Sequence, residues 1–447
     1  MSEDTIVAIA TASGMGSISI VRLSGIDSLQ IALKISKRGS LLNRLATLSK
    51  IYNHTDELID EALLIYFKNP NSFTGEDIVE FQCHGGMVIA NMIVKECLYH
   101  GARVANPGEF SKRAFLNGKI DLSQAQAISK LIEARSEDGV KLLARQLKGE
   151  LKEFVDDIKK DLTFMLAYTE VTIDYATEDL PADILNQIEE KLEKITIKLQ
   201  NTLQASSSRE GLIEGFKVSI IGKPNVGKSS LLNKLLNFNR AIVSDIAGTT
   251  RDTIEESVKI GSHLIKIVDT AGIREANDEI EKIGIEKSKQ AVDESDIVIA
   301  LFDSSREFDS EDQNIVEILK ETKKETLIAL TKSDLDKKLN SEHLALNSEH
   351  LTLNTKEDIN PLILKLENIL DKNTKSDDIT LIAVNQVEAV KQTLQNINSA
   401  KQPLYVGELE FFSYHITQAL EEISKITKPY EYSNMLDVMF GEFCLGK

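Results

Sequence analysis

One segment constrains this chain more than any other: GKPNVGKS at 222–229 has the spacing G-x-x-x-x-G-K-S, between the strand-like run FKVSII and the helical pattern SLLNKLL. Glycines at this spacing let backbone N–H groups wrap phosphate oxygens at a helix N-terminus, where the helix dipole favours negative charge. We expect Lys228 to reach the β- and γ-phosphates and the Ser229 hydroxyl to bind Mg²⁺. The sequence therefore predicts a nucleotide site inside an α/β domain.

Three further segments follow in the order that a GTPase requires: GTTRD at 248–252, DTAG at 269–272 and TKSD at 331–334. The first is expected to offer a threonine to Mg²⁺ and the γ-phosphate, and the second to hold the Mg²⁺ shell and donate an N–H. The Asp334 carboxylate can accept from N1–H and the 2-amino group of guanine, whereas adenine would leave it unpaired. The motifs therefore predict GTP rather than ATP.

The guanine-binding motifs depart from the usual pattern at two places. Thr331 stands where many GTPases have Asn, and because it lacks the carboxamide we expect a weaker contact to the base or the loop. NTK at 354–356 stands where Ser-Ala-Lys is usual, but a backbone N–H makes that contact. The residues predicted to contact the nucleotide are Asn225, Val226, Gly227, Lys228, Ser229, Ser230, Ser244, Asp245, Ile246, Ala247, Gly248, Thr249, Thr250, Asp269, Thr270, Ala271, Gly272, Thr331, Lys332, Asp334, Asn354, Thr355 and Lys356. Of these, Ser229 and Thr250 are predicted to bind Mg²⁺.

Composition excludes several classes of protein. Of 447 residues, 42% are hydrophobic and 27% charged, which is ordinary for a globular chain and excludes disordered and fibrous classes. No apolar run approaches the roughly 18 residues of a membrane span, and the acidic start argues against a leader. Cys83, Cys97 and Cys444 have neither metal-site spacing nor even pairing. The net charge of −18 argues against coating nucleic acid by bulk charge, and a cytoplasmic location is expected.

The pattern of elements predicts an α/β and α multidomain chain. Residues 1–118 mix short β-rich runs with helical patterns, which is typical of a compact α/β domain. Residues 119–212 and 372–447 have apolar positions at helical spacing, and the Ser and Gly residues within 206–211 predict a hinge. Residues 213–371 alternate strands and helices, which indicates a mostly parallel sheet covered on both faces. We therefore expect a P-loop GTPase domain inserted into a discontinuous helical domain.

The motifs GKPNVGKSS, GTTRD, DTAGIRE and DEIEKIG with the terminal CLGK together resemble, over the whole chain, the MnmE (TrmE) family of tRNA modification GTPases. The resemblance implies a tetrahydrofolate-binding N-terminal domain, a helical domain and a Ras-like G domain in a homodimer. It also implies an FAD-containing partner, in a heterotetramer or larger complex. That complex places an aminomethyl or carboxymethylaminomethyl group on C5 of the wobble uridine of certain tRNAs, using a tetrahydrofolate derivative as one-carbon donor.

The resemblance also implies roles for single residues in the modification chemistry. The folate pocket matches Arg22, Glu80, Lys119 and Lys447, and Cys444 matches a cysteine that serves the chemistry. These charges suit the amide and amine edges of a pterin and the carboxylates of a folate tail. Without the resemblance, each charged residue would be interpreted as a solvated charge and Cys444 as a small apolar residue.

A potassium ion beside the phosphates is a further implication of the resemblance. Its expected ligands are Asn225, Ser244, Ile246 and Thr249. A cation there could do the work of an arginine finger. The residues after DTAG, Ile273 and Arg274, cannot orient the attacking water, and the family role matches Glu281. The predicted catalytic residues are thus Glu281, Lys228 and Cys444.

Other functions stay open at this point. A GTP-switched assembly factor that binds ribosomal RNA would share the nucleotide motifs, but it predicts a basic module beside them. A folate-dependent transferase with a vestigial GTPase is a third interpretation, against which the intact nucleotide motifs weigh. For RNA contact, the spacing of Lys141, Arg145, Lys148 and Lys152 predicts one basic stripe on a helix, usually a solvated face. The partner is therefore expected to supply much of the tRNA contact.

Overall fold

The structure is a computed structural model of the 447-residue chain. It describes residues 4–12, 14, 16–134, 136–174, 182–238, 256–268, 281–340, 344, 350–354, 358–372, 378–428, 436, 439–441, 443 and 446. The chain divides into two compact units, the first made of 1–129, 146–196 and 388–447, and the second of 130–145 and 197–387. None of the described helices is long and apolar enough to cross a membrane.

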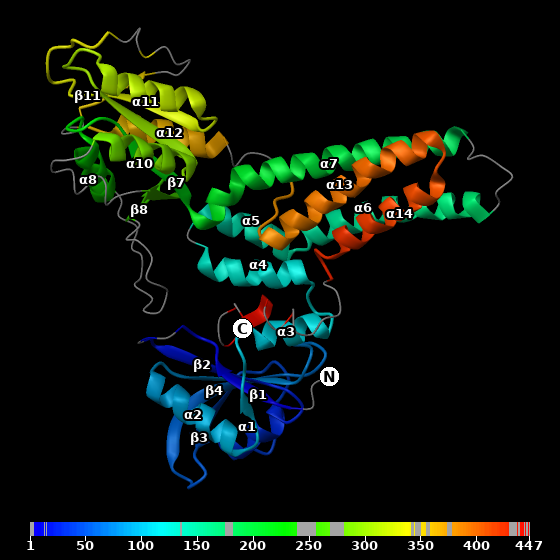
Figure 1. The fold of residues 1–447 in the computed structure, drawn as a ribbon. Helices are drawn as coiled ribbons and strands as arrows, with labels where there is room; N and C mark the ends of the chain where they lie inside the picture. Colours follow the sequence, from blue (N-terminus) through cyan, green and yellow to red (C-terminus); the bar gives the residue numbers. More distant parts are fainter. Residues whose placement is uncertain are drawn as a thin grey trace. The chain divides into compact units, whose positions relative to one another are not determined.

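The first unit contains a sheet that begins near the N-terminus (Figure 1, blue). Its described strands are β1 (Ile6–Ile9), β2 (Ile18–Ser24), β3 (Thr47–Tyr52), β4 (Leu58–Phe67), β5 (Ile78–His84) and β6 (Arg103–Val104), in the order β3-β4-β5-β2-β1-β6. Helices α1 (Ser28–Ser36) and α2 (Met87–Tyr99) bury Ile31 and Ile93 against one face, together with Val21 and Phe81. Because side chains alternate along a strand, Arg22 on β2 lies on the opposite face.

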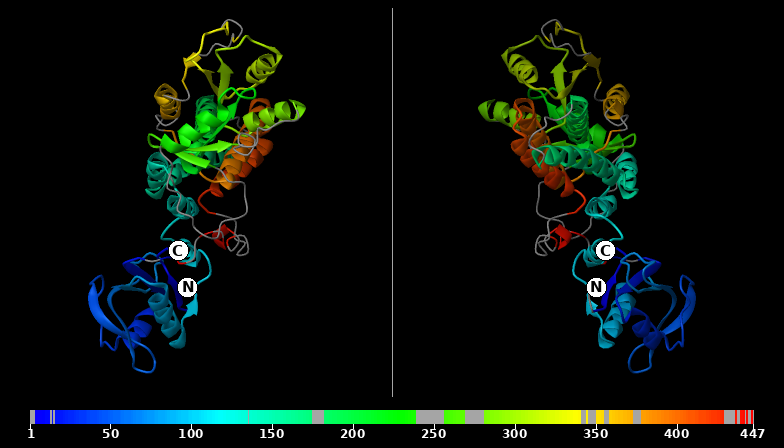
Figure 2. Two further views of the ribbon diagram at one scale, coloured as in Figure 1. Left: turned by 90° about the vertical axis from the view of Figure 1, so that its left-hand side faces the viewer. Right: turned by 90° about the vertical axis from the view of Figure 1, so that its right-hand side faces the viewer.

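Further described helices follow this sheet in the sequence, before or after the second sheet. They are α3 (Glu109–Leu116), α4 (Leu122–Glu133), α5 (Glu137–Leu147), α6 (Glu150–Asp174), α7 (Ala182–Glu214), α13 (Val384–Val406) and α14 (Leu409–Ser424). The end of α4, most of α5 and the second half of α7 belong to the second unit. α6 and α14 pack along each other (Figures 1 and 2). Lys191 of α7 forms an ion pair with Asp161 of α6 and stacks its ammonium over the Phe164 ring.

The predicted hinge at 206–211 does not occur, because α7 runs through it to Glu214. The Ser206 hydroxyl donates to the carbonyl of Thr202, one turn earlier, so this polar group has a hydrogen-bond partner inside the helix. Gly211 is required by packing, since a Cβ there would lie 2.4 Å from the Phe216 ring. The small residues therefore permit close contact within a continuous helix.

The predicted basic stripe is also wrong, because its residues do not share one helix. Lys141 and Arg145 are on α5, whereas Lys152 is on α6. Between the helices, Gly149 has a φ of +94°, a left-handed conformation that ends the helical path. Lys141 is paired with Asp138 at 2.8 Å.

A second sheet forms the core of the second unit, with helices on both faces. Its described strands are β7 (Phe216–Ile221), β8 (Glu256–Ile260), β9 (His263–Val268), β10 (Ile297–Asp303), β11 (Glu325–Thr331) and β12 (His350–Thr352), in the order β12-β11-β10-β7-β9-β8. Its described helices are α8 (Lys228–Phe238), α10 (Glu281–Asp293), α11 (Ser310–Glu321) and α12 (Asn360–Lys372). All neighbouring strands are parallel except β8 and β9, which confirms the predicted mostly parallel sheet.

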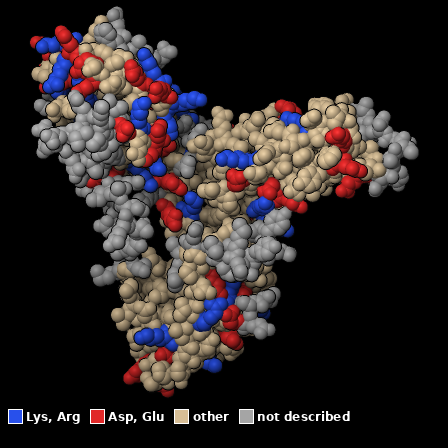
Figure 3. Space-filling view, viewed as in Figure 1, with Lys and Arg blue, Asp and Glu red and all other residues tan. Residues whose placement is uncertain are grey.

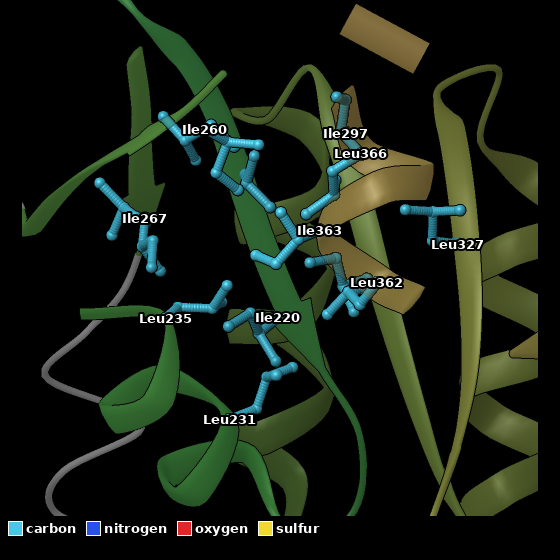
Figure 4. Packing of buried hydrophobic residues seen from close by; sticks show 14 of the residues in the cluster. Ile220, Leu231, Leu235, Ile260, Ile267, Ile297, Leu327, Leu362, Ile363 and Leu366 are labelled. Carbon is cyan, nitrogen blue, oxygen red and sulfur yellow. The ribbon is translucent and has the colours of Figure 1, made fainter. Parts of the chain in front are cut away.

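Side chains of alternate residues in β10 point to opposite faces of the sheet and belong to two different hydrophobic clusters. Ile297 and Leu301 join the cluster that α8 and α12 cover, while Val298 and Phe302 face α10 and α11. Figure 4 shows Leu235 of α8 and Ile363 of α12 meeting over Ile220 of β7. Burial on both faces explains why the strands of this sheet are nearly continuous apolar runs.

Hydrogen bonds tie the two chain segments that flank this sheet. Arg209 Nη1 donates to the Asp378 carbonyl and to Thr380 Oγ1, both at 2.8 Å. The amide of Leu381 donates to Ser206 Oγ, also at 2.8 Å. The end of α7 and the segment 378–381 therefore lie together, although about 170 residues of chain separate them.

The C-terminal segment packs on the first sheet and on α4. Phe440 is buried with Leu122 and Ala125. Gly446 has a φ of +93°, and a Cβ there would lie 2.3 Å from the Ile9 carbonyl oxygen. The chain therefore passes close to the end of β1 just before its last residue.

Candidate functional site

The phosphate loop joins β7 to α8 through a backbone that needs its glycines. Gly222 has a φ of +155°, and a Cβ there would lie 2.7 Å from the Leu301 carbonyl oxygen. Gly227 has a φ of +107°. Asn225, at +61°, is left-handed and exposed, a conformation that Asn tolerates better than most residues. The loop therefore turns tightly over the end of β7.

Lys228 lies at the first turn of α8 and reaches back across the loop. Its Nζ donates to the carbonyls of Gly222 at 2.6 Å and Lys223 at 2.9 Å. Burial lowers the pKa of Lys228 and outweighs the opposite effect of the Glu311 carboxylate. An anion placed against this ammonium would relieve that effect, so the loop fits a phosphate group.

The guanine motif at the end of β11 contacts the phosphate loop directly. Thr331 is fully buried, and its hydroxyl donates to the Val226 carbonyl at 2.7 Å. Lys332 Nζ donates to Asp303 Oδ2 at 2.6 Å, while Asp334 is exposed. Thr331 therefore makes a loop contact without a carboxamide, and Asp334 is accessible to a base.

Several predicted site residues lie outside the described residues. They are Ser244, Asp245, Ile246, Ala247, Gly248, Thr249, Thr250, Asp269, Thr270, Ala271, Gly272, Thr355, Lys356, Cys444 and Lys447. Glu281 is the first residue of α10, and only its backbone is described. Ser229 and Ser230 are exposed on the first turn of α8. Asn354 accepts at its carbonyl from the Asp358 amide at 3.1 Å.

Two predicted folate residues lie together on the sheet face that α1 and α2 leave uncovered. Arg22 and Glu80 are cross-strand partners in β2 and β5, and Arg22 Nη2 lies 2.8 Å from Glu80 Oε1. The rings of Phe73 and Phe110 flank the guanidinium, with centroids at 5.9 and 5.8 Å. The arrangement is a charged pair between aromatic rings.

Lys119 approaches the same region through a shared loop. Its Nζ donates to the Pro70 carbonyl at 2.9 Å, and its side chain lies against Gly75. That loop also carries Phe73, which flanks Arg22. Lys119 and Arg22 therefore contact one loop.

Sequence reasoning missed a buried charge network beneath this face. Arg113 on α3 contacts Glu76 at 3.1 Å, Glu109 at 3.0 Å and Asp4 at 2.8 Å. Arg103 contacts Glu109 at 2.5 Å. The only signal was the i,i+4 spacing of Glu109 and Arg113, which many surface helices share.

Two family descriptions match consecutive parts of the chain. The GTP-binding protein TrmE N-terminus matches residues 5–119, and the MnmE helical domain matches residues 122–444. The tRNA modification GTPase MnmE of Aliarcobacter butzleri is 68% identical over 446 residues, which is 100% of this chain and 99% of that protein. Its namesake in Sulfurimonas denitrificans is 59% identical over 449 residues, 100% of both. Among solved structures, the G domain of the T. maritima FeoB iron transporter is 22% identical, covering 36% of this chain and 99% of that chain at a TM-score of 0.25.

Both family descriptions and the full-length relatives agree with the motifs from 222 to 334. They confirm the predicted family and the combination of an N-terminal α/β domain, a helical domain and a P-loop domain. The chain belongs to the family of MnmE tRNA modification GTPases.

Proposed function

We propose that this GTPase acts with an FAD-containing partner to place an aminomethyl or carboxymethylaminomethyl group on C5 of the wobble uridine of certain tRNAs, with a tetrahydrofolate derivative as one-carbon donor. The observation that carries the proposal is the Lys228 ammonium, held inside a glycine loop with carbonyl oxygens at 2.6 and 2.9 Å. The proposal includes a homodimer and the division into domains 1–118, 119–212 with 372–447, and 213–371.

In the proposed hydrolysis, Lys228 stabilises the negative charge that develops on the transferred phosphoryl group. Ser229, exposed on α8, and Thr250 would hold Mg²⁺, which would supply charge neutralisation. Glu281 at the start of α10 positions the attacking water. Asp334 accepts from the guanine base.

A bound K⁺ ion supports this chemistry in the proposal. Asn225 supports the assignment because its left-handed backbone keeps the side chain at the surface of the loop. Backbone carbonyls of Ser244, Ile246 and Thr249 in the switch loop would complete the proposed ligand set. A K⁺ ion bound there would supply positive charge against the repulsion between Glu281 and the phosphate.

The folate part of the proposal rests on the Arg22–Glu80 ion pair, which lies between the rings of Phe73 and Phe110 on the face of the first sheet opposite α1 and α2. Glu80 can accept from the amine edge of a pterin, and Arg22 and Lys119 can bind carboxylates. The flanking rings of Phe73 and Phe110 provide flat apolar contacts. Gly446 lies against Ile9, which supports a role for the neighbouring Cys444 and Lys447 in the same domain.

The partner is proposed to bind much of the tRNA. On the face drawn in Figure 3, lysine and arginine side chains are interspersed with acidic ones. The net charge of −18 disfavours unassisted binding to a phosphate backbone.

Ligand binding by the full-length protein tests the proposal. We expect both GTP and a reduced folate to bind in titration calorimetry. Arg22→Met should weaken folate binding by about 10-fold or more by removing a charged hydrogen bond, with GTP binding unchanged. Lys95→Met, an exposed change on α2, is the control. Binding of GTP without folate would favour a GTP-switched ribosomal RNA factor instead.

A further inference from the structure

Lys223, the second residue of the phosphate loop, points its side chain away from the phosphate side. Its side chain is only 5% exposed, and Nζ lies 2.7 Å from both Asp309 Oδ2 and Asp312 Oδ2. Meanwhile the Lys223 carbonyl accepts from Lys228 Nζ at 2.9 Å. One residue therefore joins Lys228 of the phosphate loop to Asp312, which is buried, and to Asp309, which is half exposed.

The two acids form the N-terminal cap of α11. Asp309 is the N-cap residue, and its carboxylate accepts from the amides of Glu311 and Asp312, both at 3.1 Å. Asp312 accepts in return from the Asp309 amide at 3.3 Å. This reciprocal capping box fixes both carboxylates relative to the helix, so the position of Lys223 is set by α11.

The connection that precedes α11 also holds the guanine motif. This connection, residues 304–309, follows β10 and its last residue, Asp303. Ser304 donates to the Thr331 carbonyl from its amide at 3.0 Å and from its hydroxyl at 2.7 Å. Asp303 accepts from Lys332 at 2.6 Å. The β10–α11 connection is therefore bonded to the guanine motif at one end and to the phosphate loop at the other.

At the Lys223 end, the buried Asp312 carboxylate and the Lys223 ammonium neutralise each other by direct contact, whereas Asp309 is half exposed to solvent. Asp312 is 1% exposed, and burial raises its pKa despite the ammonium beside it. Burial also opposes the charge of Lys223, but the hydrogen bonds to Asp309 and Asp312 outweigh it and raise the pKa of Lys223. Removing Lys223 would leave the buried Asp312 charge without its ionic partner, so this contact has a strongly preferred geometry.

We propose that Lys223 is a positioning residue for GTP hydrolysis, which fixes the phosphate loop relative to the guanine motif through the β10–α11 connection. Lys223 does not touch the nucleotide. It holds the loop at the spacing that lets one GTP molecule contact Lys228 and Asp334 together. The proposal rests on the proposed GTP binding.

The first test compares Lys223→Met with Lys223→Arg in the full-length protein, and Lys217→Met, at an exposed position of the otherwise buried strand β7, is the control. Fluorescent GTP and GDP analogues report Kd, and turnover reports kcat. We expect Lys223→Met to raise Kd by about 10-fold or more, since binding to a misplaced loop loses charged contacts. Lys223→Arg should restore Kd to within about threefold, because it keeps a charged donor. A folded Lys223→Met with wild-type Kd and kcat would overturn the proposal.

A second variant keeps the test decisive if Lys223→Met fails to fold. Asp309→Asn removes a charge, but Asn is an equally good N-cap residue, so α11 stays capped. We expect a Kd raised about threefold or more with a melting temperature near that of wild type, because the loop loses one ionic contact. Unchanged nucleotide binding in this variant would contradict the proposal. If wild-type protein itself bound no GTP, the proposed function would fail before this inference was reached.

Discussion

The hydroxyl of Thr331 and the carbonyl of Val226 meet at 2.7 Å inside the nucleotide-binding fold, although 105 residues separate them. Thr331 ends β11, and Val226 lies in the turn of the phosphate loop. Thr331 is fully buried, so water cannot replace this hydrogen bond. The residue type that departs from the usual GTPase pattern therefore joins the two nucleotide loops.

Thr331→Val should loosen both loops. Valine has nearly the same shape but no donor, so the buried Val226 carbonyl loses its partner at a cost of about 1–3 kcal/mol. We expect weaker GTP binding in fluorescence titrations and a lower melting temperature. Thr331→Ser, which keeps the hydroxyl, is the matched control. Equal GTP affinity in the valine and serine variants would show that the contact does not hold the loops.

Asp334→Asn should shift base preference from guanine to xanthine nucleotides. The amide donates where xanthine carries an oxygen, whereas guanine then faces a mismatched donor. We expect a loss of GTP affinity on the order of 3 kcal/mol, from buried polar groups left unpaired. Competition of GTP, XTP and ATP for the site measures it, with Asp336→Asn as an exposed control. Equal wild-type affinity for ATP and GTP would contradict the assignment.

Glu281→Ala should slow hydrolysis by roughly 10²-fold with nucleotide affinity little changed, as for loss of a positioned base. Hydrolysis by the wild type should rise in KCl and stay low in NaCl, because Na⁺ is too small for the proposed ligand cage. Glu286→Ala, exposed on the same helix, is the control. Equal turnover in both salts, together with full kcat in Glu281→Ala, would refute both the proposed role of K⁺ and the proposed role of Glu281.

Removal of residues 444–447 should abolish wobble-uridine modification and leave GTP hydrolysis within about threefold, since transition-state contacts to the phosphates are untouched. Gly446 lies against Ile9 in the first unit, whereas the phosphate loop belongs to the second. The measurements are nucleoside analysis of tRNA from cells and phosphate release by the purified protein. Unchanged modification in the deletion strain would disprove the role of this segment.

Glu109→Gln should destabilise the first sheet in a pH-dependent way. Burial alone would raise the pKa of Glu109, but hydrogen bonds from Arg103, Asn106 and Arg113 outweigh it and lower the pKa. A carboxyl with a lowered folded pKa adds stability above its ordinary range, and that stability is lost as pH falls through the folded value. We expect faster amide hydrogen exchange in β1 and α3 of the variant at pH 7, converging with wild type in acid. If the difference in exchange rate between variant and wild type instead grew as the pH fell, the pKa of Glu109 would not be lowered in the folded protein.

The sequence predicts the strongly patterned parts of this fold well. β7, FKVSII, was expected as a strand from its apolar pattern alone, and the alternation over 213–371 predicted the mostly parallel sheet that β10 and β11 join. β8, ESVKI, was not predicted, since only its pairing with β9 makes a strand of two apolar residues among polar ones. β3 was missed for the same reason. Pairing partners decide such strands, and a single segment does not contain them.

The candidate site likewise contains some residues that the sequence predicts and some contacts that it does not. Lys228 was predicted because a loop and its helix are contiguous in the chain. The Lys223–Asp312 contact and the Thr331–Val226 hydrogen bond join residues 89 and 105 positions apart. The spacing of residues along the chain does not predict such contacts, because they depend on how the strands are ordered in the sheet.

The hydrogen bonds from Arg209 to Asp378 and Thr380 have a consequence for the order of events during synthesis. The ribosome delivers Arg209 about 170 residues before its acceptors, and α6 emerges well before its packing partner α14. If the second sheet folds first, it brings residues 209 and 378 close together. The entropic cost of closing this long loop is then offset by the folding of the sheet, before the hydrogen bonds form. Folding of the second sheet would therefore lower the entropic cost of joining the end of α7 to the segment 378–381, which the ribosome makes about 170 residues later.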